Sequence, residues 1–178
     1  MDTLIIHPSD RTTAFLNVLY NQRKNIEILD YNISNSAVRQ MLQRYNSIML
    51  LGHGTEYGLL SSYNPHNRFD RFFINPSHVN FLRNKELICI WCNANIFGEK
   101  YDLHGLFSGM VISEMSEAIE LGVETTQEEL DRENKLFAER LRFCLDNHSL
   151  HEIPEIFPTL DQSKSPLTLF NYSSIYYI

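Results

Sequence analysis

The chain has 178 residues, 43% of them hydrophobic and 12% aromatic, which suits a folded domain with a sizeable core and excludes an intrinsically disordered chain. Its formal net charge of −7 argues against nucleic acid as a partner, because phosphate binding needs a basic face. No stretch approaches the ~18 apolar residues that a membrane span requires. We therefore expect one domain over residues 1–178 that binds neither nucleic acid nor membrane.

The first part of the chain alternates short apolar runs with amphipathic segments. Turn formers and capping residues separate these segments. The predicted elements are a strand over Thr3–His7, a capped turn at Pro8–Asp10, a helix over Arg11–Asn21, an edge strand over Ile26–Tyr31 and a helix from Ser34 or Asn35 to Arg44.

Two apolar runs then end abruptly in chemically reactive residues. Ser47–Leu51 is followed by Gly52, His53 and Gly54, and Leu87–Trp91 is followed by Cys92. Short apolar runs bounded by turn formers are typical of buried strands in a parallel sheet, where neighbouring strands lie roughly 4.8 Å apart. Open α/β sheets bind ligands beyond the carboxyl ends of their strands. We therefore expect His53 and Cys92 to face each other across one cleft.

The remaining elements complete an α/β pattern. Strands that alternate with helices predict a three-layer α/β/α fold with a mostly parallel central sheet. The predicted segments are a hairpin strand over Tyr57–Ser61, a cleft-edging loop over Asn64–Arg71, a short helix from Pro76 to Leu82, a loop over Asn93–Gly105, a strand over Met110–Ser113, a short helix over Met115–Leu121, the longest helix from Thr125 or Thr126 to Leu145, and a last strand over Ile175–Ile178.

The three cysteines form no paired framework. Cys89 and Cys92 have the spacing of a redox motif, but an odd spacing along a strand places them on opposite faces, and we interpret Cys89 and Cys144 as small buried hydrophobes. An odd cysteine count, together with an apolar run at Leu4–Ile6 that is too short for a signal peptide, predicts a reducing, cytoplasmic location.

The residue types at the two strand ends suit nucleophilic catalysis. A nearby cationic imidazole or a helix N-terminus favours the thiolate form of a cysteine, and an imidazole can protonate a departing amine. A glycine such as Gly54 lets its backbone N–H approach a developing oxyanion. Taken singly, His53 fits an ordinary loop histidine and Cys92 fits a buried thiol. Because both residues follow a predicted strand at its carboxyl end, we favour a catalytic role for the pair. Trp91, inside its strand, is expected in the core.

These motifs resemble the caspase-like cysteine peptidases, a group that includes caspases, legumains, gingipains, clostripain, separase and CHAT domains. The resemblance spans Thr3 to about Leu121. It implies a caspase-like fold without a cofactor, with His53 as the catalytic histidine, Cys92 as the nucleophile, the N–H groups of Gly54 and Cys92 as the oxyanion hole, and a peptide or protein substrate. Ile90–Trp91 replaces the Gln–Ala that precedes the cysteine in caspases, so the resemblance is nearest to CHAT and gingipain-like members.

Other side chains have two interpretations each. Glu114 could select a basic substrate residue or cap a helix, and His7 could line the same pocket or pack in the core. His104 also precedes a glycine, but it follows a loop rather than a strand. His148 and His151 have helical spacing without further ligands, so we expect no metal site.

We therefore predict a cysteine-type endopeptidase with a His53/Cys92 dyad. The alternative is a catalytically inactive caspase-like module that binds a protein partner. A flavodoxin-like phosphate binder is a weaker third option, because the turn Pro8–Arg11 lacks the glycines of a phosphate cradle.

Overall fold

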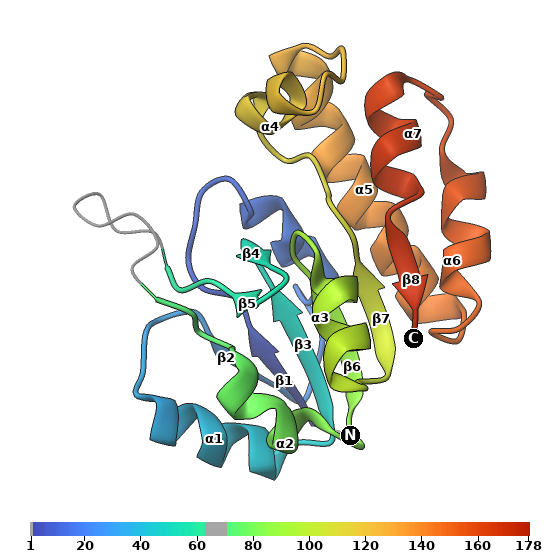
Figure 1. Ribbon diagram of the computed structural model, residues 1–178. Coiled ribbons are helices and arrows are strands. Elements are labelled where there is room, and N and C mark those ends of the chain that lie inside the picture. The colour runs from blue at the N-terminus through green and yellow to red at the C-terminus, as the bar shows by residue number, and fades with distance from the viewer. Residues whose placement is uncertain (1, 63–70) are drawn as a thin grey trace.

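A six-stranded, mostly parallel sheet forms the centre of the protein, which a computed structural model describes over residues 2–62 and 71–178. The strands are β1 (Thr3–Ile6), β2 (Ile26–Leu29), β3 (Ser47–Leu51), β4 (Gly54–Thr55), β5 (Gly58–Leu59), β6 (Glu86–Ile90), β7 (Gly105–Ser108) and β8 (Ile175–Tyr177). Their order in the main sheet is β2-β1-β3-β6-β7-β8, with only β8 antiparallel to its neighbour (Figure 1). β4 and β5 form a separate antiparallel hairpin.

Helices cover both faces of this sheet, so the predicted α/β/α architecture is confirmed. The α-helices are α1 (Asn35–Arg44), α2 (Val79–Leu82), α3 (Ala94–Tyr101), α4 (Met115–Glu120), α5 (Gln127–Asn147), α6 (Ile153–Ile156) and α7 (Pro166–Tyr172). The 3-10 helices are η1 (Ala14–Leu19), η2 (Pro76–His78) and η3 (Phe157–Leu160).

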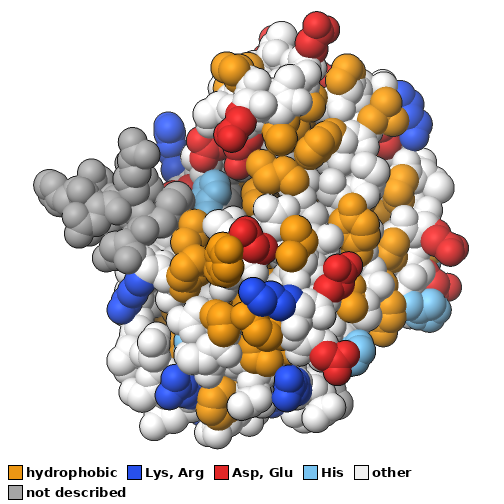
Figure 2. All heavy atoms as spheres, in the orientation of Figure 1, with side chains coloured by type: hydrophobic (Ala, Val, Ile, Leu, Met, Phe, Trp, Pro, Cys, Tyr) orange, Lys and Arg blue, Asp and Glu red, His pale blue; other side chains and the backbone are white. Residues whose placement is uncertain are grey.

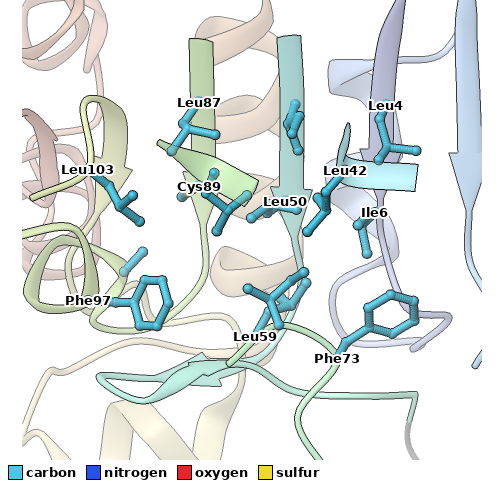
Figure 3. Packing of buried hydrophobic residues seen from close by; sticks show 14 of the residues in the cluster. Leu4, Ile6, Leu42, Leu50, Leu59, Phe73, Leu87, Cys89, Phe97 and Leu103 are labelled. Carbon is cyan, nitrogen blue, oxygen red and sulfur yellow. The ribbon is translucent and has the colours of Figure 1, made fainter. Parts of the chain in front are cut away.

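Alternation along the strands divides the core into two layers. Leu4, Leu50 and Cys89 belong to the layer in which Leu42 of α1 and Phe97 of α3 also pack (Figure 3). All five side chains are almost fully buried. Because successive side chains of a strand point to opposite faces, the residues between them serve the other layer.

The second layer lies between the sheet and the long helix α5. Ile5, Met49 and Ile88 pack with Leu16 of η1 and Phe137 of α5. Each fully buried apolar side chain of this size stabilises the fold by about 1.5–3 kcal/mol, so the two layers hold the sheet rigidly. This rigid sheet positions the loops that follow its strands.

Two predictions for the middle of the chain are wrong. The segment Asn93–Gly105, predicted as a loop, contains α3, and the strand predicted over Met110–Ser113 is replaced by β7, which ends at Ser108. The backbone N–H of Ile112 donates to Oδ1 of Asn171 at 2.8 Å, and Nδ2 of Asn171 donates to the Ile112 carbonyl at 2.9 Å. The buried amide of α7 therefore occupies the backbone groups that a strand would have paired.

Other predictions agree with the structure in part. The helix expected over Arg11–Asn21 is a shorter 3-10 helix, and the hairpin expected after His53 is present as β4 and β5. Of the loop predicted to edge the cleft, residues 64–70 lie outside the described residues. None of the helices within 2–62 and 71–178 has the length and apolarity of a membrane span.

Candidate active site

The register of β3 against β6 places the predicted dyad at one edge of the sheet. Leu51 pairs with Ile90, and His53 and Cys92 each lie two residues beyond this pair. The N–H of Gly52 donates to the Ile90 carbonyl at 3.1 Å, which extends the pairing one step further. The carboxyl ends of two parallel strands thus bring the imidazole and the thiol to the same rim, as the sequence predicted.

The loop that carries His53 is tied to the strand that carries Cys92. The His53 carbonyl accepts a hydrogen bond from the N–H of Leu60 at 2.8 Å, which anchors it to the β4–β5 hairpin. Trp91 donates its indole N–H to the Thr55 carbonyl at 3.1 Å, and its side chain is 2% exposed. The core role predicted for Trp91 is confirmed, and the indole links the two loops.

A hydroxyl and two carboxylates surround Nε2 of His53. Thr12 Oγ1 lies 2.6 Å from Nε2, Asp10 Oδ1 lies 3.5 Å away and Glu114 Oε1 lies 3.7 Å away. Sequence reasoning placed Asp10 only as a turn cap and missed Thr12. The signal was present, because β1 pairs with β3 and the turn after β1 therefore meets the same rim.

Asp10 accepts two hydrogen bonds from Thr12, the residue that also contacts His53. Asp10 Oδ1 accepts from the Thr12 backbone N–H at 2.8 Å and from the Thr12 hydroxyl at 2.5 Å. Partial burial opposes ionisation of Asp10, yet the Thr12 bonds and the His53 imidazole keep the pKa of this carboxyl below its usual value. Because the single hydroxyl proton goes to the carboxylate, Thr12 Oγ1 has a lone pair available to accept from Nε2 of His53.

Cys92 is half-buried. Its thiol donates a weak hydrogen bond to the Val111 carbonyl at 3.6 Å. Burial, followed by the negative charges of Glu117 and Glu114, raises the pKa of Cys92 to about 11. The thiol is therefore neutral at neutral pH, which differs from the thiolate that the sequence led us to expect.

The structure also places a helix N-terminus next to this thiol. α3 begins at Ala94, two residues after Cys92, with Asn93 in the left-handed conformation at its cap. The apolar spacing of Ala94, Phe97 and Tyr101 could have revealed this helix in the sequence. A helix N-terminus stabilises a nearby anion, so α3 favours the thiolate and opposes the effect of burial on this sulfur.

Two adjoining cavities define the space around the dyad. A cavity of about 20 Å³, lined by both His53 and Cys92, has room for a water molecule only. A cleft of about 630 Å³ shares the wall residues Phe15 and Ser113 with this cavity and includes Glu114. The dyad therefore lies at the end of a cleft large enough for a peptide segment.

Glu114 caps a helix, which was one of the two roles predicted for it, and its place at a cleft leaves substrate selection a prediction. It is the N-cap residue of α4, where its carboxylate accepts from the backbone of Glu117 and the Glu117 carboxylate accepts from the N–H of Glu114. It also lines the large cleft. Figure 2 shows acidic side chains grouped near α4 on the face it displays.

His7 does not line the large cleft beside the dyad, so its suggested place in that pocket is corrected. The imidazole is 4% exposed and lines a different cavity, of about 150 Å³. Nδ1 is hydrogen-bonded to the hydroxyl of Tyr20 at 3.1 Å, and Nε2 to the hydroxyl of Thr13 at 3.3 Å. Burial lowers the pKa of His7 to about 4, which fits a neutral packing residue.

The remaining histidines do not compete with His53. His104 lies directly before β7, so it occupies the amino-end rim of the parallel sheet, opposite Cys92. His148 packs against Phe143 and His151 against Tyr177. Over the described ranges, no three His, Cys, Asp or Glu side chains come together as a metal site.

The arrangement combines a thiol, an imidazole and a neighbouring cleft. The oxyanion-hole role of the Gly54 and Cys92 N–H groups stays a prediction, although both residues belong to this rim. Comparison of the chain with protein-family models, with curated proteins and with solved structures finds no match in any of the three.

Proposed function

We propose that the chain is a cysteine endopeptidase in which Cys92 is the nucleophile and His53 the acid–base catalyst. The observation that carries this proposal is the shared cavity of the two side chains at the carboxyl-end rim, which opens beside a peptide-sized cleft. The resemblance of the His53 and Cys92 motifs to caspase-like peptidases supports the same reaction.

The proposed reaction returns Cys92 and His53 to their starting protonation states. Nδ1 of His53 takes the thiol proton as the Cys92 sulfur bonds to the peptide carbonyl carbon, and backbone N–H groups stabilise the oxyanion. The peptide C–N bond then breaks, and His53 gives the proton to the departing amine. Water, deprotonated by His53, hydrolyses the thioester, and the proton returns to the Cys92 sulfur.

The half-buried thiol has little free space beside it for a substrate. The thiol bonds to the carbonyl of Val111, and the cavity beside it holds only about 20 Å³. This limited space favours a second candidate, a non-catalytic module that binds a protein partner through the large cleft. The two candidates differ in what peptide binding does to Cys92.

Covalent labelling distinguishes the two functions. Iodoacetamide should alkylate Cys92 slowly at neutral pH, and the rate should rise about tenfold per pH unit toward the pKa of about 11, because only the thiolate reacts. A peptidyl acyloxymethyl ketone should instead label Cys92 at neutral pH, roughly 10²-fold faster than its non-peptidyl analogue, because bound substrate is oriented at the sulfur. Mass spectrometry identifies the labelled cysteine.

The binding module predicts a different result. If no peptidyl ketone labels Cys92 faster than the non-peptidyl analogue, the thiol is not part of a peptidase site. Buried Cys89 serves as the internal control, since burial raises its pKa well above the usual value and it should remain unmodified with either reagent.

The cleft favours a basic substrate side chain. Glu114 and Asp131 line it, together with Asn134, which is 6% exposed. Oδ1 of Asn134 has no hydrogen-bond partner among the described residues, while its Nδ2 donates to the Ser113 carbonyl. These groups offer two carboxylates and one amide oxygen to a guanidinium or ammonium group. Arg11 is the single basic residue among the described residues that line the cleft.

Asp131→Asn tests this preference without altering a residue near His53. The ratio of kcat/KM for an arginine substrate to kcat/KM for its alanine counterpart should fall about tenfold, equivalent to ~1.4 kcal/mol. Because both values of kcat/KM are measured on the same variant, a general loss of activity cancels in the ratio. The matched control is Glu139→Gln, which should leave the ratio unchanged. Glu139 is an acidic residue of the same helix and pairs with Lys135. An unchanged ratio in Asp131→Asn would contradict the preference.

A further inference from the structure

The His53 ring is held by a hydroxyl that is itself held by a carboxylate. Thr12 Oγ1 lies 2.6 Å from Nε2 of His53, and the same oxygen donates to Asp10 Oδ1. Asp10 also accepts the backbone N–H of Thr12, so both ends of Thr12 are fixed on one carboxylate oxygen. Side chains of His53 and Asp10 are 13% and 12% exposed, which limits competition from water.

We infer that Asp10 and Thr12 form a positioning pair that fixes the tautomer and orientation of His53. A carboxylate accepts hydrogen bonds and donates none, so the Thr12 hydroxyl must use its only proton on Asp10. Its lone pair then accepts from Nε2–H of His53. The neutral ring therefore carries its lone pair on Nδ1, which is the nitrogen that exchanges protons with the thiol and the leaving amine.

The pair also supports the ring after it gains a proton. When Nδ1 is protonated, Nε2–H still donates to Thr12, and the Asp10 carboxylate lies 3.5 Å from Nε2. An anion at this distance stabilises the imidazolium that forms during the reaction. Glu114, at 3.7 Å, contributes charge but belongs to the cap of α4 and to the cleft wall. Of these three groups, Thr12 makes the shortest contact with Nε2, at 2.6 Å.

Three variants separate positioning from general structure. Thr12→Val keeps the shape of the side chain and removes the hydroxyl, so kcat for peptide hydrolysis should fall on the order of 10²-fold while KM changes little. Thr12→Ser restores the hydroxyl and should recover most of kcat. The matched control is Thr125→Val, because the Thr125 hydroxyl also donates to a carboxylate, that of Glu129 in the first turn of α5.

The kcat measurements rest on the proposed function, because they need a peptidase. A spectroscopic measurement tests the inference independently of catalysis. Imidazole ¹⁵N shifts, with the His53 signal identified by its loss in His53→Ala, should show the Nε2–H tautomer in the unmodified protein. Thr12→Val should show a mixture of tautomers. If the shifts behave in this way but no peptide is cleaved, the peptidase proposal fails and the positioning pair stands.

Three results would overturn the inference. The first is an Nδ1–H tautomer at His53 in the unmodified protein, because Nε2 would then not donate to Thr12. The second is a cleaving enzyme in which Thr12→Val retains both the kcat and the tautomer of the unmodified protein. A Thr12→Ser variant as impaired as Thr12→Val, with unchanged shifts, would likewise assign Thr12 to packing alone.

Discussion

Cys92→Ala should abolish peptide hydrolysis, and His53→Ala should reduce kcat/KM roughly 10³-fold or more, since the removal of one member of a catalytic unit eliminates most of its effect. Neither side chain is a main core residue, so both variants should keep the fold. Steady-state hydrolysis of a peptide mixture, followed by mass spectrometry, measures the loss. Thermal melting of each variant shows that the loss is not caused by unfolding.

Matched controls make this result specific. Cys89→Ala removes the thiol three residues earlier, which is buried in the core layer, and His104→Ala removes the exposed histidine at the opposite rim. Both should retain hydrolysis, although Cys89→Ala should be less stable. Cleavage at the original rate by purified Cys92→Ala or His53→Ala would contradict the proposed mechanism directly.

Gly54→Ala should destabilise the protein by about 1–3 kcal/mol and remove activity, because an added methyl group has no space. A Cβ at Gly54 would lie 2.0 Å from Cδ1 and 2.5 Å from Cγ of Trp91, and 2.7 Å from the Gly58 carbonyl oxygen. Trp91 cannot withdraw easily, since its indole is buried and bonds to Thr55. The clash would push the His53 loop away from Cys92.

Denaturant unfolding measures the destabilisation, and Gly122→Ala supplies the comparison. Gly122 has a φ of +67° with nothing within 4 Å of an added Cβ, so this substitution tests backbone strain alone, at about 1–2 kcal/mol. It lies just beyond α4 and should leave the dyad in place. The two variants should differ mainly in activity. Full hydrolysis by Gly54→Ala would show that the Trp91 contact does not position the loop.

Opposing influences act on the Cys92 thiol. Burial and two nearby glutamates raise its pKa, whereas the start of α3 favours the anion. A peptide in the large cleft would contact Ser113, two residues from the Val111 carbonyl that holds the thiol. If the proposed function holds, displacement of this short segment by a bound peptide should make the Cys92 sulfur more accessible.

The position of the dyad could be predicted from the sequence because it depends on local patterns. The buried runs Ser47–Leu51 and Leu87–Trp91 contain enough apolar residues to require a place inside a sheet, and parallel strands end at a common edge. His53 and Cys92 follow these runs directly. Periodicity and turn residues therefore determined the strands, their burial and the rim on which the two side chains lie.

The surroundings of the dyad depend on contacts between distant segments, which no local pattern encodes. Gly98 falls in the segment predicted as a loop, yet it lies inside α3, where an added Cβ would approach the Phe107 ring at 2.9 Å. The sequence predicts Ile112 in a strand, but in the structure its backbone groups form hydrogen bonds with the Asn171 amide. Propensity alone cannot rank such alternatives, because tertiary partners decide the outcome.

The sequence by itself determined an α/β sheet and a histidine and cysteine at one rim, since hydrophobic alternation and strand ends are local properties. Only the tertiary structure decided the protonation and orientation of these groups. Thr12 reaches His53 across 41 positions of the chain, and Val111 covers Cys92 across 19. Hydrogen bonding and burial at the site arise from chain segments that meet only after folding, so they fix the chemistry that sequence spacing leaves open.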